Sequence, residues 1–280
     1  MRRSGTSGTP HPAFGHPLPA RGERALEIPR PAKRGEGGAK RRVRGAILAF
    51  FLFAATAAAA RAECVARADV RDLPLVELQA TQQKGDRFAI MVSGDGGWRR
   101  IDTKVTDKLR ADGMPVVGFL ANEYFRTRRS PDDCGCALER VIRYYRIVFR
   151  KPNVVLIGYS RGADVLPFMA SRVPADLRPS VKLVALLGLE ATIDFKYTPS
   201  WFFWHFKKEP QFAVKPELEK LRGNNILCVY GEKEKASLCH ELEPGLAKII
   251  REPGGHHFAG KYADVAEAII AEAAAPAGRN

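Results

Sequence analysis

The chain has 280 residues, 45% of them hydrophobic, and a formal net charge of +14. This length and composition favour a globular protein with a sizeable core. The positive charge is concentrated at the start, because residues 1–62 hold twelve Lys or Arg and only three Asp or Glu, which leaves about +5 for the remainder. A charge of that size does not indicate a nucleic-acid-binding protein.

Residues 1–62 have the composition of a secretory leader. Several arginines precede a fifteen-residue apolar run at 46–60, and Ala60 and Ala62 have the spacing of a cleavage site. The run is shorter than the roughly 20 residues of a membrane-spanning helix. We therefore predict cleavage near Ala62, export to the periplasm and a single mature domain over 63–280. A retained N-terminal anchor is the alternative.

Short apolar runs alternate with helix-compatible stretches along the mature domain. The runs that predict strands are 75–80, 87–92, 115–120, 153–157, 181–187, 225–230 and 248–251. The stretches that predict helices are 102–112, 137–149, 161–172, 216–222 and 262–273. This alternation predicts an α/β fold with a mostly parallel central sheet and helices on both faces, its first strand antiparallel. Such sheets bind ligands at the carboxyl ends of their strands.

Residues 189–215 interrupt this alternation. They include a cluster of aromatic residues at 201–206. We predict a small excursion that packs over the end of the sheet. A lid or a contact for an acyl chain is the functional alternative.

All five cysteines follow the predicted cleavage position, where export would permit disulfides. An odd number leaves at least one cysteine free or in an intermolecular bond. Cys228 and Cys239 are a candidate disulfide that would join a strand to the loop after it. Cys134 and Cys136 are separated by one residue, which is neither a redox nor a zinc spacing, so no metal is predicted.

The segment Gly158-Tyr-Ser-Arg-Gly162 follows one predicted strand and begins a predicted helix. This is the setting of a nucleophile elbow, and it predicts Ser160 as the nucleophile. Gly158 and Gly162 are small because the strand and the helix come close together at such a turn. The backbone amide of Arg161, at the start of the helix, is placed to donate to an oxyanion.

A catalytic histidine is expected after the last strand, where the chain reads Gly254-Gly-His-His-Phe258. An imidazole here would take the proton from Ser160 and return it to the leaving group. We favour His256, because Gly-Gly-His-x-Phe resembles the histidine loop of many hydrolases. His257 is the close competitor, and a surface or metal-binding histidine pair is the alternative without catalysis.

The third member of a serine triad is an acid that orients the imidazole. The loop after the strand at 225–230 reads Gly231-Glu-Lys-Glu-Lys235, and Glu234 is our choice within it. Glu232 in the same loop is a second possibility. Glu190 and Asp194 could serve from elsewhere.

The second part of an oxyanion hole is expected after the first parallel strand, in Ser93-Gly-Asp-Gly-Gly-Trp98. The glycines let backbone amides approach a ligand, and those of Asp95 and Gly96 are the predicted donors. The run lacks both the phosphate-loop and the dinucleotide-binding patterns. No cofactor is predicted.

Three motifs together resemble the VirJ/AcvB family of bacterial virulence proteins: Ser93 to Trp98, Gly158-Tyr-Ser-Arg-Gly-Ala-Asp-Val-Leu-Pro167 and Gly254 to Phe258. The resemblance covers roughly residues 86–270. It implies a periplasmic α/β-hydrolase, because the AcvB branch is associated with hydrolysis of lysyl-phosphatidylglycerol and VirJ with transfer of DNA and protein by type IV secretion. The chain departs from the pattern at Ala236, where an acidic residue is expected.

The resemblance therefore implies a serine hydrolase that removes an aminoacyl group from a phospholipid at the membrane surface. A cationic lysyl group favours an acidic pocket wall, for which Asp95, Glu123 and Glu190 are candidates. Two alternatives stay open. One is a type IV secretion accessory that binds exported substrates or secretion components, and the other is a general carboxylesterase or thioesterase.

Overall fold

The computed structural model describes residues 69–197 and 211–276. The predicted leader, its cleavage position near Ala62 and the aromatic cluster at 201–206 lie outside the described residues. These three features therefore stay predictions.

A seven-stranded sheet forms the centre of the fold, with the strand order β1-β3-β2-β4-β5-β8-β9. Its strands are β1 (Leu75–Leu78), β2 (Arg87–Val92), β3 (Val116–Phe119), β4 (Asn153–Tyr159), β5 (Val181–Leu187), β8 (Ile226–Gly231) and β9 (Lys248–Glu252). β1 pairs antiparallel with β3, and the other neighbours pair parallel. Parallel strands covered on both faces need continuous apolar runs, which is what the sequence contains.

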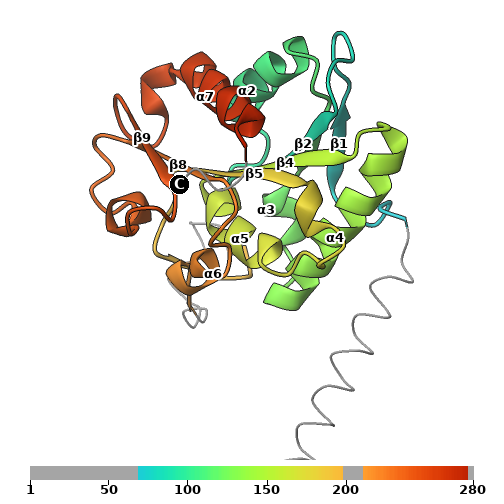
Figure 1. Ribbon diagram of the computed structural model, residues 1–280. Coiled ribbons are helices and arrows are strands. Elements are labelled where there is room, and N and C mark those ends of the chain that lie inside the picture. The colour runs from blue at the N-terminus through green and yellow to red at the C-terminus, as the bar shows by residue number, and fades with distance from the viewer. Residues whose placement is uncertain (1–68, 198–210, 277–280) are drawn as a thin grey trace, which may run out of the picture. The chain divides into compact units, whose positions relative to one another are not determined.

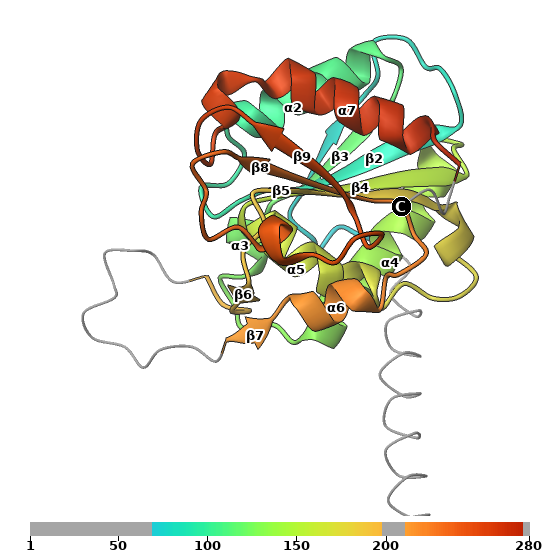
Figure 2. The ribbon, with the colours of Figure 1, turned by 60° about the vertical axis from the view of Figure 1, so that its left-hand side comes forward.

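Helices cover both faces of the sheet, as predicted (Figures 1 and 2). One face carries α2 (Arg100–Ala111) and α7 (Tyr262–Ala274). The other carries α3 (Ala121–Tyr124), α4 (Pro131–Val148), α5 (Arg161–Ala170) and α6 (Lys215–Glu219). Short 3-10 helices are η1 (Arg178–Ser180), η3 (Leu238–Glu241) and η4 (Phe258–Gly260).

The central strand β4 divides its side chains between the two layers. Val154 and Leu156 pack in the hydrophobic cluster that contains α4 and α5. Val155 and Ile157 pack in the cluster that contains α2 and α7. Because successive side chains of a strand point to opposite faces, both layers are anchored to the strand that precedes the nucleophile turn.

The predicted strands and helices agree with the structure to within a few residues, with one larger difference. Helix α4 begins at Pro131, six residues before its predicted start at 137. Ser130 caps it, because its hydroxyl accepts a hydrogen bond from the Asp133 amide and the Asp133 carboxylate accepts one from the Ser130 amide. A capping box followed by proline in the first turn is a strong start signal, and it outweighs the glycine at position 135.

Residues 189–197 and 211–215, the described parts of the segment predicted as an excursion, form a small structure beside the main sheet. β6 (Thr192–Ile193) and β7 (Phe212–Ala213) pair antiparallel as a separate two-stranded sheet. Phe195 lies between them in the chain, and its ring packs edge-on against Phe168 of α5. The excursion is therefore anchored on the helix that follows the nucleophile turn.

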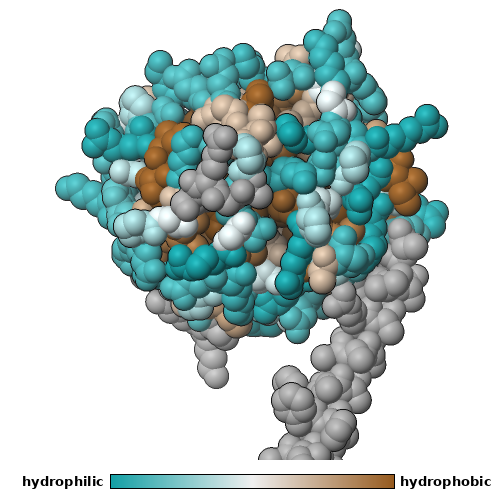
Figure 3. Space-filling model, viewed as in Figure 1, coloured by the Kyte–Doolittle hydropathy of each residue, from teal (hydrophilic) through white to brown (hydrophobic). Residues whose placement is uncertain are grey.

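On the face shown in Figure 3, hydrophilic residues predominate and apolar residues lie in several patches among them. Among residues 69–197 and 211–276, no helix has the length and apolar composition needed to cross a membrane.

Asp102 fixes the start of α2, just after the predicted oxyanion loop. Its side chain is fully buried, and Oδ2 accepts a hydrogen bond of 2.8 Å from the Arg99 amide. Oδ1 has no hydrogen-bond partner among the described residues. Burial is the main cause that raises the pKa of Asp102 to about 6, with the hydrogen bond from Arg99 opposing it. The folded protein therefore binds this proton more tightly than the unfolded chain does.

This difference predicts a pH-dependent stability that the variant Asp102→Asn should lack. A carboxyl whose pKa rises from 3.8 to about 6 on folding reduces the stability as the pH rises through that interval, by about 3 kcal/mol. Asparagine keeps an acceptor for the Arg99 amide and does not titrate. Urea denaturation of both proteins between pH 4 and 7 measures the effect. Parallel pH profiles for the two proteins would contradict it.

Candidate active site

Ser160 occupies a strained turn between β4 and α5. Its backbone has φ 54° and ψ −125°, in the positive-φ region that residues other than glycine rarely enter. The Ser160 amide donates a 2.9 Å hydrogen bond to the Leu187 carbonyl at the end of β5. Strain of this kind costs about 1–3 kcal/mol and is typical of functional sites. The geometry is that of a nucleophile elbow.

The two flanking glycines are required by close backbone contacts. A Cβ atom at Gly158 would collide with the Gly162 carbonyl. A Cβ atom at Gly162 would collide with the Val92 carbonyl at the end of β2. The elbow is thus pressed against the end of the neighbouring strand, and a larger residue at either position would force the turn apart.

The loop after β9 carries His256, whose Nδ1 lies 2.5 Å from Glu234 Oε1. The other carboxylate oxygen, Oε2, accepts a 2.6 Å hydrogen bond from the Gly231 amide. Burial by itself would raise the pKa of Glu234, but the hydrogen bonds from His256 and Gly231 outweigh it and lower the pKa. Glu234 is therefore an anionic partner for the imidazole at neutral pH.

His257 has a different partner. Its Nδ1 lies 2.8 Å from the Tyr159 hydroxyl, which also donates a 3.2 Å hydrogen bond to the His256 carbonyl. The Tyr159 ring lies beside the His256 ring, with centroids 5.2 Å apart. Tyr159 therefore holds the histidine loop from the residue directly before Ser160. Of the two histidines, only His256 pairs with an acid in the described structure.

Ser160 and His256 both lie against the turn that ends β5. The Ser160 amide bonds to Leu187, and a Cβ atom at the next residue, Gly188, would lie 2.7 Å from His256 Cε1. Within the described residues, the Ser160 hydroxyl makes no hydrogen bond to either imidazole. Catalytic hydrogen bonds are often longer in free enzymes than in their complexes with substrate.

Gly188 is a site residue that sequence reasoning missed. Its φ is +69°, and the missing side chain leaves the space that the His256 ring fills, with Glu234 Oε1 3.4 Å from the same point. A glycine directly after a buried strand is the only sequence signal for it, and that signal is weak. The contact becomes visible only when the strands at 181–187 and 248–252 are placed in one sheet.

The predicted oxyanion loop lies beside the nucleophile. A Cβ atom at Gly94 would be 3.1 Å from the Cβ atom of Ser160. The Gly97 amide bonds to the Gly94 carbonyl at 3.0 Å, so Asp95 and Gly96 form the centre of a turn. Among the described residues, the amides of Asp95, Gly96 and Arg161 donate no hydrogen bond. They are therefore available to a ligand oxygen near Ser160.

The Arg161 side chain joins two loops of the site. Its Nε donates to Asp95 Oδ1, and its Nη1 donates to the Asp194 carbonyl at 2.9 Å and to Asp194 Oδ1 at 3.1 Å. Asp194 is therefore a partner of Arg161 rather than of a histidine. Glu190 is exposed, and its carboxylate makes no hydrogen bond to a histidine among the described residues, while its amide donates to buried Asp164 Oδ1 at 2.7 Å.

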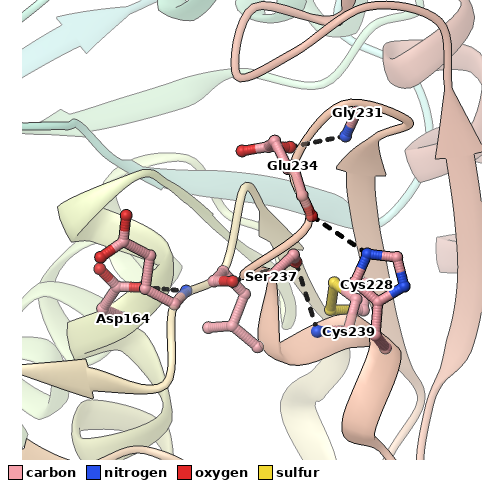
Figure 4. Close-up of a disulfide and its surroundings, with 9 residues drawn as sticks. Asp164, Cys228, Gly231, Glu234, Ser237 and Cys239 are labelled. Atoms are coloured by element: carbon pink, nitrogen blue, oxygen red, sulfur yellow. Dashed lines mark hydrogen bonds between the residues drawn. A yellow bond between two sulfur atoms is a disulfide. The ribbon is translucent and has the colours of Figure 1, made fainter. Parts of the chain in front are cut away.

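The loop that carries Glu234 is fastened at both ends. Cys228 of β8 and Cys239 of η3 form the candidate disulfide, with Cα atoms 5.8 Å apart. Figure 4 shows the Glu234 carboxylate directed at the Gly231 amide, and Ser237 beside Cys239. Ser237 Oγ also donates to the Leu189 carbonyl at 3.1 Å, which ties this loop to the end of β5.

Two further residues singled out from the sequence, Glu232 and Cys134, have no part in the pairing of Glu234 with His256. Glu232 Oε1 accepts a 3.3 Å hydrogen bond from the Gly254 amide, so it supports the histidine loop from outside. Cys134 is free and buried, and burial is the main cause that raises the pKa of its thiol. In the part of the chain that the structure describes, no group of three His, Cys, Asp or Glu is arranged to hold a metal ion.

Solved structures with the same fold share little sequence with this chain. Est1E from Butyrivibrio proteoclasticus is 13% identical with a TM-score of 0.50, over 74% of this chain and 98% of that one. MenH from S. aureus is 13% identical with a TM-score of 0.49, over 71% of this chain and 98% of that one. Together with the strand order and the elbow, the likeness to Est1E identifies the α/β-hydrolase fold.

Comparisons of sequence, unlike those of structure, identify a family. No curated protein sequence matches the chain. A family model does match, the one described as "Bacterial virulence protein (VirJ)", and it covers residues 86–276, most of the described structure. This chain belongs to the VirJ family.

Proposed function

We propose that this protein is a periplasmic serine hydrolase that cleaves the aminoacyl ester of lysyl-phosphatidylglycerol or of a related aminoacyl lipid. The observation that carries the proposal is the pairing of Glu234 with His256, beside an elbow that holds Ser160 at φ 54°. These are the residue types and the chain order of serine, acid and histidine in α/β-hydrolases.

The reaction proceeds in two steps. The Ser160 oxygen attacks the aminoacyl carbonyl carbon while His256 Nε2 takes the hydroxyl proton, and the carbonyl oxygen becomes an oxyanion. When the oxyanion collapses, the bond to the glycerol oxygen breaks and that oxygen takes the proton from His256. Water then attacks the acyl-enzyme by the same route, which releases the amino acid and restores Ser160. No cofactor takes part in these steps.

The electrostatics of the site support a cationic acyl group. Asp95 and Asp194 lie around Arg161 and supply two negative charges for its one positive charge. Exposed Glu190 follows the turn against which His256 packs. The carboxylates around Arg161 favour an ammonium group on this side of the oxyanion loop, while Arg99 lies against Gly96 in the same loop.

The proposed compartment is supported by the Cys228–Cys239 disulfide. Disulfides persist in oxidising compartments such as the periplasm and are rare in the cytosol. The predicted leader, which lies outside the described residues, would deliver the chain there.

The first test uses purified wild-type protein and Ser160→Ala with vesicles that contain lysyl-phosphatidylglycerol. The wild type should release lysine, and the variant should lose at least about 10⁴-fold in kcat, because no other described hydroxyl occupies the elbow. Mass spectrometry of the lipids and assay of free lysine measure both.

A panel of short-chain esters and acyl thioesters run in parallel distinguishes the broader esterase activity. Faster turnover of these soluble esters than of the lipid would reject the lipid assignment. Equal lysine release by both proteins would reject the serine mechanism.

The second test concerns the acid. Glu234→Gln should lower kcat about 10³-fold, because the amide cannot stabilise the imidazolium that forms during attack. Glu232→Gln is the matched control from the same loop, and we expect its kcat to stay within about threefold of the wild type. The measurement is the steady-state rate at pH 7 for the three proteins. A larger loss in Glu232→Gln than in Glu234→Gln would reassign the acid.

The third test concerns the space at Gly188. In Gly188→Ala the new methyl group would lie 2.7 Å from His256 Cε1, so the ring must shift and kcat should fall about 100-fold. Gly85→Ala is the control, because Gly85 has a similar φ of +63° with nothing within 4 Å of the added atom. Thermal melting should show a similar small loss of stability in both variants. Equal activity in the two would contradict the proposed role.

A further inference from the structure

The Arg161 side chain is the most heavily bonded group near the nucleophile that the mechanism leaves unused. It is only 9% exposed, and it belongs to the residue that directly follows Ser160 in the chain. Serine elbows need only the backbone amide of this residue. A buried guanidinium at this position must therefore be explained by what it binds.

We propose that the Arg161 side chain is a positioning residue that neutralises the Asp95 carboxylate and holds the oxyanion loop for the transition state. This inference rests on the proposed serine hydrolysis and assigns a role within the same site. Arg161 would thus act twice, through its amide as an oxyanion donor and through its guanidinium on the neighbouring loop.

The first part of the evidence is the position of Asp95. The residue follows Gly94, where an added Cβ atom would lie only 3.1 Å from the Cβ atom of Ser160. Its amide is unbonded among the described residues and lies at the centre of the Gly94–Gly97 turn. The Asp95 carboxylate belongs to the same residue as a predicted oxyanion donor. Without a cation beside it, this carboxylate would repel the negative charge that develops on the substrate oxygen.

The second part is the charge of the guanidinium. Burial by itself would lower the pKa of Arg161, but the hydrogen bonds and negative charges of Asp95 and Asp194 outweigh it and raise the pKa. The side chain is a permanent cation that lies between the two carboxylates. Its contact with Asp95 compensates the negative charge carried by the predicted oxyanion loop.

The third part is the anchor on the opposite side. Nη1 donates to both the carbonyl and Oδ1 of Asp194, and Asp194 Oδ1 also accepts a 3.2 Å hydrogen bond from the Lys196 amide. The guanidinium is therefore also held by a second loop, separate in the chain from the one that carries Asp95. A planar group with separate donors can bond to both loops at once, which a lysine ammonium on a flexible stem does less well.

The experiment compares four proteins: wild type, Arg161→Met, Asp95→Asn and the double variant. Arg161→Met should lower kcat about 100-fold with KM within threefold, because an oxyanion contact acts in the transition state and not in substrate binding. Asp95→Asn, which removes the charge and keeps an oxygen acceptor, should lower kcat about threefold. The double variant should recover at least tenfold over Arg161→Met, because the uncompensated carboxylate is gone.

Two further variants separate positioning from folding. Arg140→Met removes an arginine of similar burial, 7% exposed. Among the described residues, Arg140 binds Asp72 and the Asp69 carbonyl, and it contacts none of the proposed site residues. It should lower the melting temperature and leave kcat unchanged. Arg161→Lys keeps the cation and should lower kcat about tenfold. If Arg161→Met does not fold, the kcat of Arg161→Lys still tests the proposal.

The outcomes are distinct. A kcat in Arg161→Met or Arg161→Lys equal to that of the wild type, with Ser160→Ala inactive, overturns the role of the side chain alone. A double variant no faster than Arg161→Met overturns the neutralisation of Asp95. Activity retained in Ser160→Ala instead overturns the proposed function. The affinity of a boronic acid that forms a tetrahedral adduct with serine should fall by the same factor as kcat.

Discussion

The elbow at Ser160 is the constraint on which the rest of the site depends. A single residue at positive φ turns the chain from the central strand β4 into α5, and the turn is possible only because Gly158 and Gly162 carry no side chains. The strain is held by packing on both faces of β4 and by the Ser160 bond to Leu187. The same turn leaves the Arg161 amide and side chain at the start of α5, beside the oxyanion loop.

The sheet order brings the other groups to this turn. β5, β8 and β9 follow β4 in the order of the sheet, so the loops after them lie side by side at the carboxyl ends of the strands. Gly188 from the first loop makes room for the imidazole, Glu234 from the second binds it, and His256 arrives on the third. The Cys228–Cys239 disulfide and the Ser237 contact with Leu189 join two of these loops. Glu234 and His256 are therefore each supported by a neighbouring loop.

The strands were predictable because buried parallel strands are continuous apolar runs. Ser160, His256 and Glu234 stood out because each follows such a run in a recognisable motif, and their catalytic roles stay predictions. The short helix at 121–124 and the early start of α4 were missed, since local capping decides them. Gly188 and the Tyr159 contact with His257 depend on packing between distant segments. No spacing in the sequence encodes such contacts. For Arg161, the elbow motif predicted the place of its backbone amide. The contacts of its guanidinium with Asp95 and Asp194 could be seen only in the folded structure.

The position of β9 at the edge of the sheet has a consequence for thermal inactivation. β9 is an edge strand of five residues that pairs only with β8, and three of its residues are exposed. Edges of this kind open locally at a lower free energy than the core does. Because His256 is carried on the loop just after β9, local opening of this edge would displace the proposed general base while the remaining strands stay folded. On mild heating, the proposed hydrolase activity would therefore fall before spectroscopic signals from the central strands change.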